Sequence, residues 1–156
     1  MAFQASIDID HPPATVFGWL ADLEKLPEWE TSFAEVRREG EGPVRAGAAY
    51  WCRRNQPTKT ETTMVVTEYE PLKKLVIESD WAGFLKPKFG YLVESVGTGT
   101  RVTLFASPKV RGMGRLMAPM IGLLGPRLTV RYLDNLKRLI DSAEVSDGRA
   151  VGQPGR

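Results

Sequence analysis

Cysteine and histidine are almost absent from this chain of 156 residues. Cys52 is the single cysteine and His11 the single histidine. One cysteine excludes an intrachain disulfide, and one histidine far from it leaves no zinc site of the usual kind. No sequence motif for a nucleotide or another cofactor stands out. The sequence therefore predicts neither a metal nor a cofactor.

Long hydrophobic runs and a surplus of charge are also missing. The longest apolar stretch, Leu116–Leu124, contains Pro119 and Gly122 and is far shorter than the roughly 20 residues that span a bilayer. The opening residues, MAFQASIDID, lack the basic and apolar regions of a secretory signal. A net charge of +2 is too small to indicate nucleic-acid binding. We expect a cytoplasmic protein with no integral membrane segment and no nucleic-acid partner.

What is present is the composition of an ordinary globular domain. Hydrophobic residues make up 42% of the chain and charged residues 26%, and the length suits one domain. The last residues, 144–156, contain glycine, proline and polar residues without a period, which is typical of a disordered tail. The sequence predicts one domain over residues 1–143, as a monomer or a homodimer.

Alternating apolar and polar residues, separated by turn signals, predict an antiparallel sheet of about seven strands. The expected strands are Phe3–Asp10, Phe33–Arg38, Ala48–Arg54, Thr58–Tyr69, Leu75–Asp80, Lys88–Val96 and Arg101–Ser107. A loop at Gly97–Thr100 would place Val93 opposite Leu104 and Tyr91 opposite Ala106, all on one face of the sheet. For the strand Thr58–Tyr69, both faces suit the lining of a cavity.

Helical spacing appears near both ends of the chain. A short helix is expected over Ala14–Ala21, with a second helical turn after Asp22. A clear amphipathic pattern predicts a long helix over Arg127–Ala143. Before it, Gly112–Gly125 is apolar but rich in glycine, and the pair Gly125-Pro126 predicts a kink or a break.

Several segments together resemble a known family. They are Asp10–Phe17, Leu20–Trp29, Gly42-Pro43 with Gly47, Thr67–Pro71, Gly99–Thr103 and Leu133–Ile140. Over Phe3 to Ala143 the chain is similar to the polyketide cyclase/dehydrase family of the START-like superfamily, also called SRPBCC. The resemblance implies an α+β helix-grip fold, in which a curved antiparallel sheet of about seven strands wraps around the long C-terminal helix. Such a fold would enclose a pocket for an apolar small molecule.

The large side chains of the middle strands and of the last third of the chain suit such a pocket. The predicted ligand-binding residues are Trp29, Phe33, Tyr50, Tyr91, Val93, Leu104, Met117, Met120, Leu124, Leu128 and Tyr132. Ordinary core packing is the alternative for each of them. Gly112–Gly125 is interpreted as a cover over the pocket mouth, with a dimer contact or a membrane-surface contact as alternatives. The basic cluster Arg111, Arg115, Arg127 and Arg131 is either a solvated face or a positive rim for an acidic ligand head or an anionic membrane.

Catalysis in this pocket would require polar groups that stabilise an enolate or move a proton. The candidates are Tyr50, Arg54, Glu61, Tyr91 and Tyr132, although no pair among them has a diagnostic spacing. The hydroxyl of Thr129 needs either a ligand or a hydrogen bond to a neighbouring strand. His11 is interpreted as an exposed or capping residue, and Cys52 as a small buried one.

Three functions therefore fit the sequence. The first is binding of a hydrophobic small molecule, such as a lipid, a polyketide, an isoprenoid or an aromatic compound, between the sheet and the C-terminal helix. The second is a polyketide cyclase or dehydratase that acts in the same cavity. The third is a protein-interaction module that resembles the activator domain of chaperone ATPases.

Overall fold

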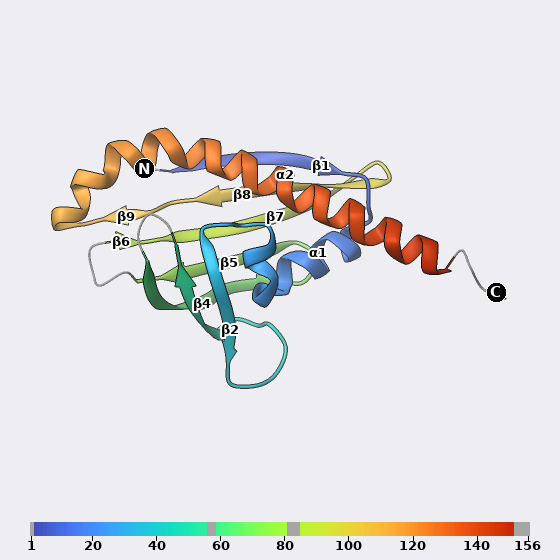
Figure 1. The fold of residues 1–156 in the computed structure, drawn as a ribbon, viewed down its shortest axis with the longest axis horizontal. Helices are drawn as coiled ribbons and strands as arrows, with labels where there is room; N and C mark the ends of the chain where they lie inside the picture. The colour runs from blue at the N-terminus through green and yellow to red at the C-terminus, as the bar shows by residue number, and fades with distance from the viewer. Residues whose placement is uncertain (1, 56–58, 81–84, 152–156) are drawn as a thin grey trace.

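A curved antiparallel sheet wraps around a long C-terminal helix in the computed structural model, which describes residues 2–55, 59–80 and 85–151 (Figure 1). Within these residues the sheet has seven strands in the order β1-β8-β7-β5-β4-β3-β2. Their bounds are β1 Phe3–Ile9, β2 Phe33–Glu39, β3 Ala49–Arg54, β4 Thr60–Glu70, β5 Lys74–Ser79, β7 Lys88–Val96 and β8 Gly99–Ala106. The predicted α+β architecture is confirmed.

Two details of the strands differ from the prediction. A small second sheet pairs β6 (Leu85–Lys86) with β9 (Lys109–Val110), and two-residue strands are too short to show an alternating pattern. The expected strand Thr58–Tyr69 corresponds to β4, although its residue 58 lies outside the described residues. The inner face of β4 is now assigned, because Met64 and Val66 are buried there.

The hairpin between β7 and β8 has a tighter turn than expected. Tyr91 lies opposite Leu104, and Val93 lies opposite Val102, so the predicted register was wrong by two residues. Gly97 has a φ of 58°, a conformation that glycine adopts easily and that a two-residue hairpin turn requires. A slip of two residues keeps every side chain on its face. The predicted common face of Tyr91, Val93 and Leu104 is therefore confirmed.

The long helix begins earlier than the sequence predicts. Helix α2 spans Ala118–Val151 and follows a short 3-10 helix, η2 (Gly112–Met117). The predicted start at Arg127 was wrong, and so was a break at Gly125-Pro126, because α2 continues through Pro126. Instead, Figure 1 shows the first turns of α2 bending away from the direction of the rest. Proline removes one helical hydrogen bond, and the helical turns on either side of it hold the helix together.

Helix α2 also runs beyond the predicted end of the domain. It is helical through Val151, where a disordered tail was expected from residue 144, and residues 152–156 lie outside the described part. The domain boundary at residue 143 stays a prediction. In the described residues, no helix is both long enough and apolar enough to cross a membrane.

The core lies between the concave face of the sheet and the second half of α2. Leu133, Leu136 and Ile140 of α2 are buried there. Helix α1 (Pro13–Ala21) and the 3-10 helix η1 (Leu23–Glu28) complete the core with Leu20 and the neighbouring Trp29. The predicted short helix and helical turn are thus confirmed. Buried Cys52 also belongs to this core, as predicted.

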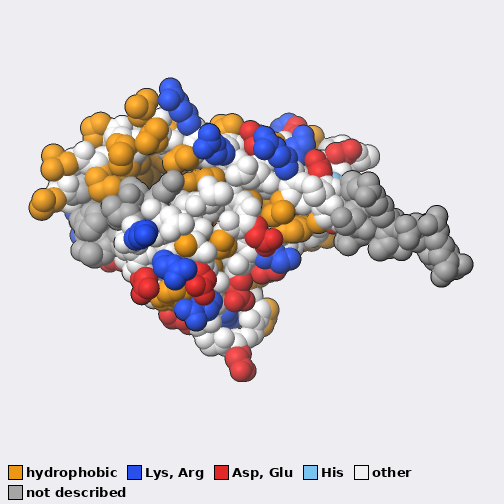
Figure 2. All heavy atoms as spheres, in the orientation of Figure 1, with side chains coloured by type: hydrophobic (Ala, Val, Ile, Leu, Met, Phe, Trp, Pro, Cys, Tyr) orange, Lys and Arg blue, Asp and Glu red, His pale blue; other side chains and the backbone are white. Residues whose placement is uncertain are grey.

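The first half of α2 is not buried in the same way. Large apolar side chains gather on the surface at the end of the molecule where η2 and the first turns of α2 lie (Figure 2). We name this set the apolar tip: Met113, Leu116, Met120, Leu123 and Leu124, all of them exposed. The two halves of one helix therefore have different surroundings.

Candidate ligand-binding pocket

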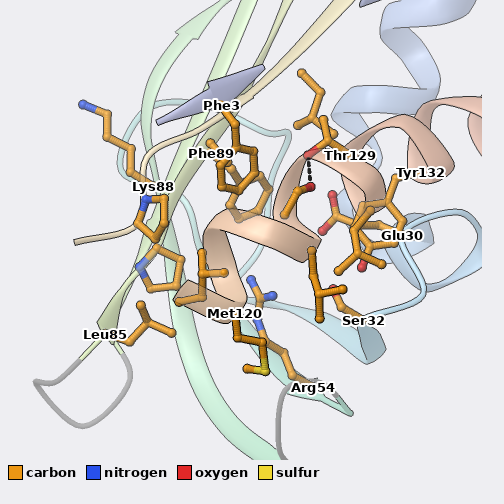
Figure 3. Close-up of a pocket in the computed structure, with 18 residues that line it drawn as sticks. Phe3, Glu30, Ser32, Arg54, Leu85, Lys88, Phe89, Met120, Thr129 and Tyr132 are labelled. Atoms are coloured by element: carbon orange, nitrogen blue, oxygen red, sulfur yellow. Dashed lines mark hydrogen bonds between the residues drawn. The ribbon is translucent and has the colours of Figure 1, made fainter. Parts of the chain in front are cut away.

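A pocket of about 490 Å³ lies between the first half of α2 and the sheet (Figure 3). Its walls come from β1, the segment after η1, the end of β3, the β6–β7 region, β8 and α2. They are formed by Phe3, Glu30, Ser32, Arg54, Leu85, Pro87, Lys88, Phe89, Leu104, Ala106, Pro108, Met120, Ile121, Leu124, Gly125, Leu128, Thr129 and Tyr132. A volume of this size is typical of sites that bind small organic molecules.

A close approach between α2 and β1 shapes one wall. A Cβ atom added to Gly125 would lie 2.5 Å from Cζ of Phe3, closer than two carbon atoms pack. A larger residue at position 125 would therefore require the Phe3 ring to move from its place under the helix. Phe3 lies beside Phe89 in the pocket (Figure 3). Most of the wall is apolar, so it favours the hydrocarbon or aromatic part of a ligand.

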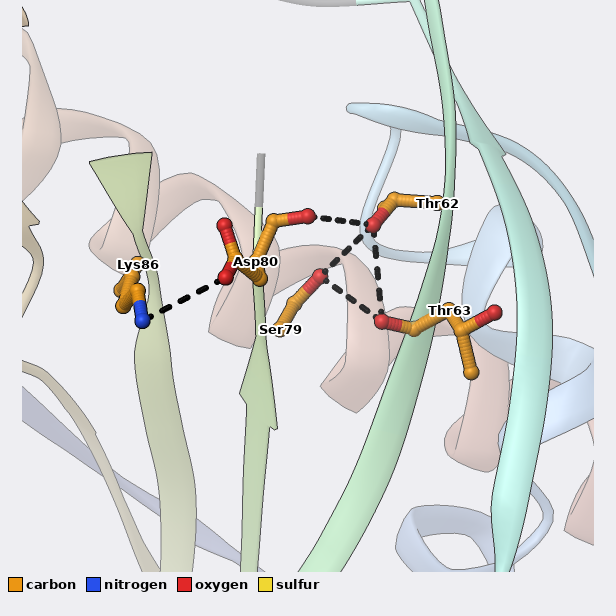
Figure 4. A network of polar contacts seen from close by, with 5 residues as sticks. All are labelled: Thr62, Thr63, Ser79, Asp80 and Lys86. Carbon is orange, nitrogen blue, oxygen red and sulfur yellow. Dashed lines mark hydrogen bonds and ion pairs between the residues drawn. The ribbon is translucent and has the colours of Figure 1, made fainter. Parts of the chain in front are cut away.

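Polar contacts hold the β6 side of the pocket in place (Figure 4). The hydroxyl of Thr62 donates to the carbonyl oxygen of Asp80 at 2.8 Å, and the hydroxyl of Ser79 donates to the carbonyl oxygen of Thr63 at 3.2 Å. Lys86 Nζ lies 3.4 Å from Oδ2 of the Asp80 carboxylate. These contacts join β6 to β4 and β5, and β6 carries the pocket residue Leu85.

One end of the pocket is polar, because Glu30, Ser32, Arg54 and Tyr132 meet there. The backbone around Glu30 is fixed from two sides. The Glu30 amide donates to the carbonyl of Leu26 at 2.8 Å, and Asn135 Nδ2 of α2 donates to the carbonyl of Trp29 at 3.1 Å. Both η1 and α2 therefore position the Glu30 carboxyl group.

Glu30 is a buried carboxyl group whose proton affinity is changed by its surroundings. Burial raises the pKa of Glu30 to about 7, against the opposing effects of the positive charge of Arg54 and of a hydrogen bond from Tyr91. That hydrogen bond runs from Tyr91 Oη to Glu30 Oε1 over 3.3 Å. A carboxyl group with a pKa near neutrality can give or take a proton at physiological pH.

Arg54 places a positive charge near enough to this carboxyl group to oppose the rise of its pKa. Its guanidinium lies over the ring of Phe33, 4.0 Å from the ring centroid. Burial lowers the pKa of Arg54, while the charge of Glu30 raises it; an arginine in such a site remains protonated. The arrangement offers a fixed cation and a titratable carboxyl group at the end of an apolar pocket.

The structure brings five of the predicted ligand-binding residues to the pocket wall: Leu104, Met120, Leu124, Leu128 and Tyr132. Four others are buried in the core and do not line the pocket: Trp29, Phe33, Tyr91 and Val93. Met117 lies outside the lining, and Tyr50 borders a separate depression next to Arg38 and Asp22. Their roles in binding stay predictions.

The catalytic candidates are similarly divided. Arg54 and Tyr132 line the pocket, and Tyr91 reaches it only through its hydrogen bond to Glu30. Tyr50 lies at the other depression, and Glu61 is exposed on β4 opposite Arg53. Thr129 satisfies its hydroxyl within its own helix, by donating to the carbonyl of Gly125 at 2.8 Å, and still lines the pocket (Figure 3). A bond to a neighbouring strand was therefore the wrong alternative.

Sequence reasoning missed Glu30, Ser32 and Phe3, which all line the pocket. The only local signal for Glu30 is a charged residue between two large aromatics, Trp29 and Phe33. His11 lies away from the pocket, where its Nε2 is 2.9 Å from Oδ1 of Asp141 on α2. That contact fastens the corner before α1 to the second half of α2.

Comparison with known proteins agrees with this architecture. The chain resembles the solved structures of TTHA0849 from Thermus thermophilus (TM-score 0.75, 18% identity, covering 92% of this chain and 99% of that one) and of the Zhui aromatase/cyclase from Streptomyces sp. R1128 (TM-score 0.75, 12% identity, 90% and 93%). A START superfamily protein from Mycobacterium smegmatis is similar as well (TM-score 0.74, 11% identity, 91% and 98%). At such low identity these likenesses establish the fold alone.

The sequence itself carries the assignment to a family. No curated protein matches the chain. The family model described as "Polyketide cyclase / dehydrase and lipid transport", however, matches residues 1–141, which is most of the chain. A match of this extent includes the sheet, the pocket and the core part of α2. The chain therefore belongs to the polyketide cyclase/dehydrase and lipid transport family, and its fold is that of the solved structures named above.

Proposed function

We propose that this protein binds a hydrophobic small molecule with one polar end in the pocket beneath the first half of α2. A lipid, a polyketide, an isoprenoid or an aromatic compound would suit the apolar walls. The observation that carries the proposal is the contrast inside the pocket, where apolar side chains form most of the wall and Glu30 and Arg54 lie together at one end.

The two ends of the pocket favour one orientation of the ligand. The apolar part would lie against Phe3, Phe89 and Leu128, where its transfer from water is favourable. The polar part would lie at Glu30 and Arg54. The guanidinium donates hydrogen bonds to a carbonyl or carboxylate, and the carboxyl group accepts one from a hydroxyl or donates one when protonated. An unsubstituted hydrocarbon would offer neither group a hydrogen bond and would bind less tightly.

The direct test is denaturing mass spectrometry of the small molecules that copurify with the protein. Leu128→Arg would place a charged side chain in the pocket, and Val130→Arg would place one on the exposed side of the same helix. We expect a copurified amphipathic molecule in the wild type and in V130R, and its loss in L128R. Binding can also be measured in solution, by displacement of anilinonaphthalene sulfonate with palmitate. Palmitate should displace the dye from wild type and V130R, and it should bind L128R at least roughly tenfold more weakly. Equal binding by both variants would refute the proposal.

A second candidate function is polyketide cyclisation, which the raised pKa of Glu30 favours. The ionised carboxylate would take a proton from a carbon between two carbonyl groups. The guanidinium of Arg54 would stabilise the negative charge that forms on the enolate oxygen. Attack of the enolate carbon on a second carbonyl would close the ring, and the protonated Glu30 would return its proton to the alkoxide that forms. Loss of this hydroxyl group together with a proton from the neighbouring carbon would release water and complete the dehydration.

The cyclase candidate has its own test. A linear poly-β-ketone thioester is incubated with the protein, and the products are followed by chromatography with mass detection. The expected result is a cyclic product that has lost water, formed by the wild type and not by Glu30→Gln. Because E30Q keeps the size of the side chain, it should still bind the substrate. Equal product in the presence and absence of protein would leave ligand binding as the function and exclude the cyclase.

A further inference from the structure

The apolar tip and the charges around it form an unusual surface. Met113 and Leu116 are 83% and 80% exposed, and Leu123 is 61% exposed. They protrude from η2 and from the first turns of α2, and no described part of the chain covers them. Burying such side chains against an apolar phase is strongly favourable, and contiguous exposed apolar residues mark interaction sites.

The sequence around the tip is depleted of negative charge. Between Glu94 and Asp134 there is no Asp or Glu, although Lys and Arg occur six times. Four of these cations, Arg111, Arg115, Arg127 and Arg131, flank or follow the tip and are exposed. In Figure 2 the part of the surface that carries the gathered apolar side chains contains Lys and Arg side chains but no acidic ones. The tip is therefore apolar at its centre and positive at its border.

From these observations we propose that the apolar tip docks the protein on an anionic membrane surface. The side chains of Met113, Leu116 and Leu123 enter the boundary between lipid headgroups and acyl chains. The surrounding arginines bind the lipid phosphates, while their aliphatic stems extend along the apolar layer. Each cation near an anionic surface adds to the attraction, and salt weakens it.

A membrane fits this surface better than a second copy of the chain does. A two-fold contact would place the same patch against itself, so arginines would face arginines with no carboxylate between Glu94 and Asp134 to compensate them. A lipid surface has the opposite charge and an apolar interior. Single protruding side chains, rather than a groove, also suit insertion into a fluid layer.

Docking would bring the pocket to the bilayer. Met120 and Leu124 belong to the tip and also line the pocket. The part of the pocket wall that they form would then face the acyl chains, so an apolar ligand could pass between membrane and pocket at this wall without crossing water. This consequence rests on the proposed function, whereas docking itself does not depend on any ligand in the pocket.

The test is flotation of the purified protein with vesicles. One set contains phosphatidylcholine alone, and the other contains phosphatidylcholine mixed with phosphatidylglycerol. We expect the wild type to float with the mixed vesicles, and less so as salt is added. Leu116→Ser/Leu123→Ser should weaken this partition at least roughly tenfold, and Arg115→Gln/Arg127→Gln should weaken it roughly thirtyfold. None of these four residues lines the pocket.

Matched controls change the same residue types elsewhere on the surface. Leu72→Ser/Leu92→Ser removes two exposed leucines far from α2 in the sequence, and Arg45→Gln/Lys59→Gln removes two exposed cations. Both controls should float like the wild type, and thermal unfolding verifies that every variant is folded. Failure of the wild type to float would overturn the proposal, as would equal flotation of all variants.

Two further outcomes would assign the surface to another partner. If the arginine variant loses flotation and the leucine variant does not, attraction is electrostatic only and insertion is refuted. If analytical ultracentrifugation shows a dimer that L116S/L123S converts to a monomer, and the wild type does not float, the apolar tip is an interface between copies. Palmitate binding is measured in parallel, so loss of docking with intact palmitate binding separates this proposal from the pocket function.

Discussion

The two halves of α2 differ in what their apolar residues do. In the second half, Leu133, Leu136 and Ile140 are buried between the helix and the sheet. In the first half, Met120 and Leu124 line the pocket while remaining partly exposed, and Leu123 points away from it. Apolar residues at helical spacing therefore form the core in one half of the helix and line a pocket in the other. The reason is that the sheet packs against the second half, whereas the pocket lies between the sheet and the first half.

The largest expected effect is the difference in stability loss between a Leu→Ala substitution in the second half of α2 and one in the first half. Leu136→Ala should lower the free energy of unfolding by roughly 2–5 kcal/mol, because it leaves a cavity in a closed core. Leu123→Ala should change it by less than about 0.5 kcal/mol, because the side chain is already in water. Urea unfolding monitored by circular dichroism measures both. Equal losses would show that the first half of α2 is packed as tightly as the second.

A second test uses pH, because Glu30 lies where η1 meets the second half of α2. Its ordinary pKa of 4.5 rises to about 7 in the folded protein, so the folded state holds the proton more tightly than the unfolded state. The stability that this proton provides is complete below about pH 4.5 and is lost as the pH rises through 7. The loss should be roughly 3 kcal/mol relative to Glu30→Gln.

The control for this test is the variant itself, measured over the same pH range. The difference in the free energy of unfolding between wild type and E30Q isolates Glu30 from the other titrating groups. Parallel curves for the two proteins between about pH 4.5 and 8 would mean that Glu30 ionises with an ordinary pKa, and the acid–base role of this residue would then lose its support.

A smaller effect on stability is expected from a substitution at Gly125, at the junction of the two halves. In Gly125→Ala the new methyl group collides with the Phe3 ring, which must turn away and alter the pocket wall. Alanine also favours the helix by roughly 1 kcal/mol, so the net change in stability should be small while palmitate binding weakens several-fold. The double variant Phe3→Ala/Gly125→Ala removes the collision and should be more stable than F3A alone. A double variant less stable than F3A would show that the collision is not the reason for glycine.

The smallest effect concerns the movement of the first half. Hydrogen exchange over Arg111–Pro126 should be faster than over the part of α2 that carries Leu133 and Ile140, because fewer buried contacts oppose opening there. Adding palmitate should slow exchange in Arg111–Pro126 and leave the second half unchanged. Slow exchange in both halves, with or without palmitate, would identify the segment as a fixed wall and not as a cover.

The fold could be predicted because its signals are local. Alternation marks β1, β7 and β8, and the helical spacing of Leu133, Leu136 and Ile140 marks the core side of α2. The predicted pairing around the turn at Gly97 was wrong by two residues. The assignment of side chains to the two faces of the sheet was still correct, because side chains alternate between the faces with a period of two residues. The predicted start of α2 was wrong because proline and glycine usually weaken a helix. In this chain they lie within α2, and the helical turns on either side of them hold the helix together.

The site could be predicted only in part, since its composition depends on distant segments. The periodicity of α2 identifies Leu128 and Tyr132 as inward-facing, and both line the pocket. The same reasoning assigns Tyr91 and Val93 to the inner face correctly, but it cannot tell whether helix α2 or empty space lies opposite them. Glu30 was missed for a related reason, because its carboxyl group is buried only in the folded protein, where the distant residue Tyr91 donates a hydrogen bond to it.

The close passage of α2 over Phe3 at Gly125 has a consequence for how such a protein can diversify. Met120, Ile121 and Leu124, before this crossing, line the pocket, whereas Leu133, Leu136 and Ile140, well after it, are buried in the core. Substitutions at Met120, Ile121 or Leu124 can therefore reshape the pocket without exhausting the small stability margin that a domain of this size has. A scaffold divided in this way can acquire a preference for a new ligand through few mutations, while the same core continues to fold it.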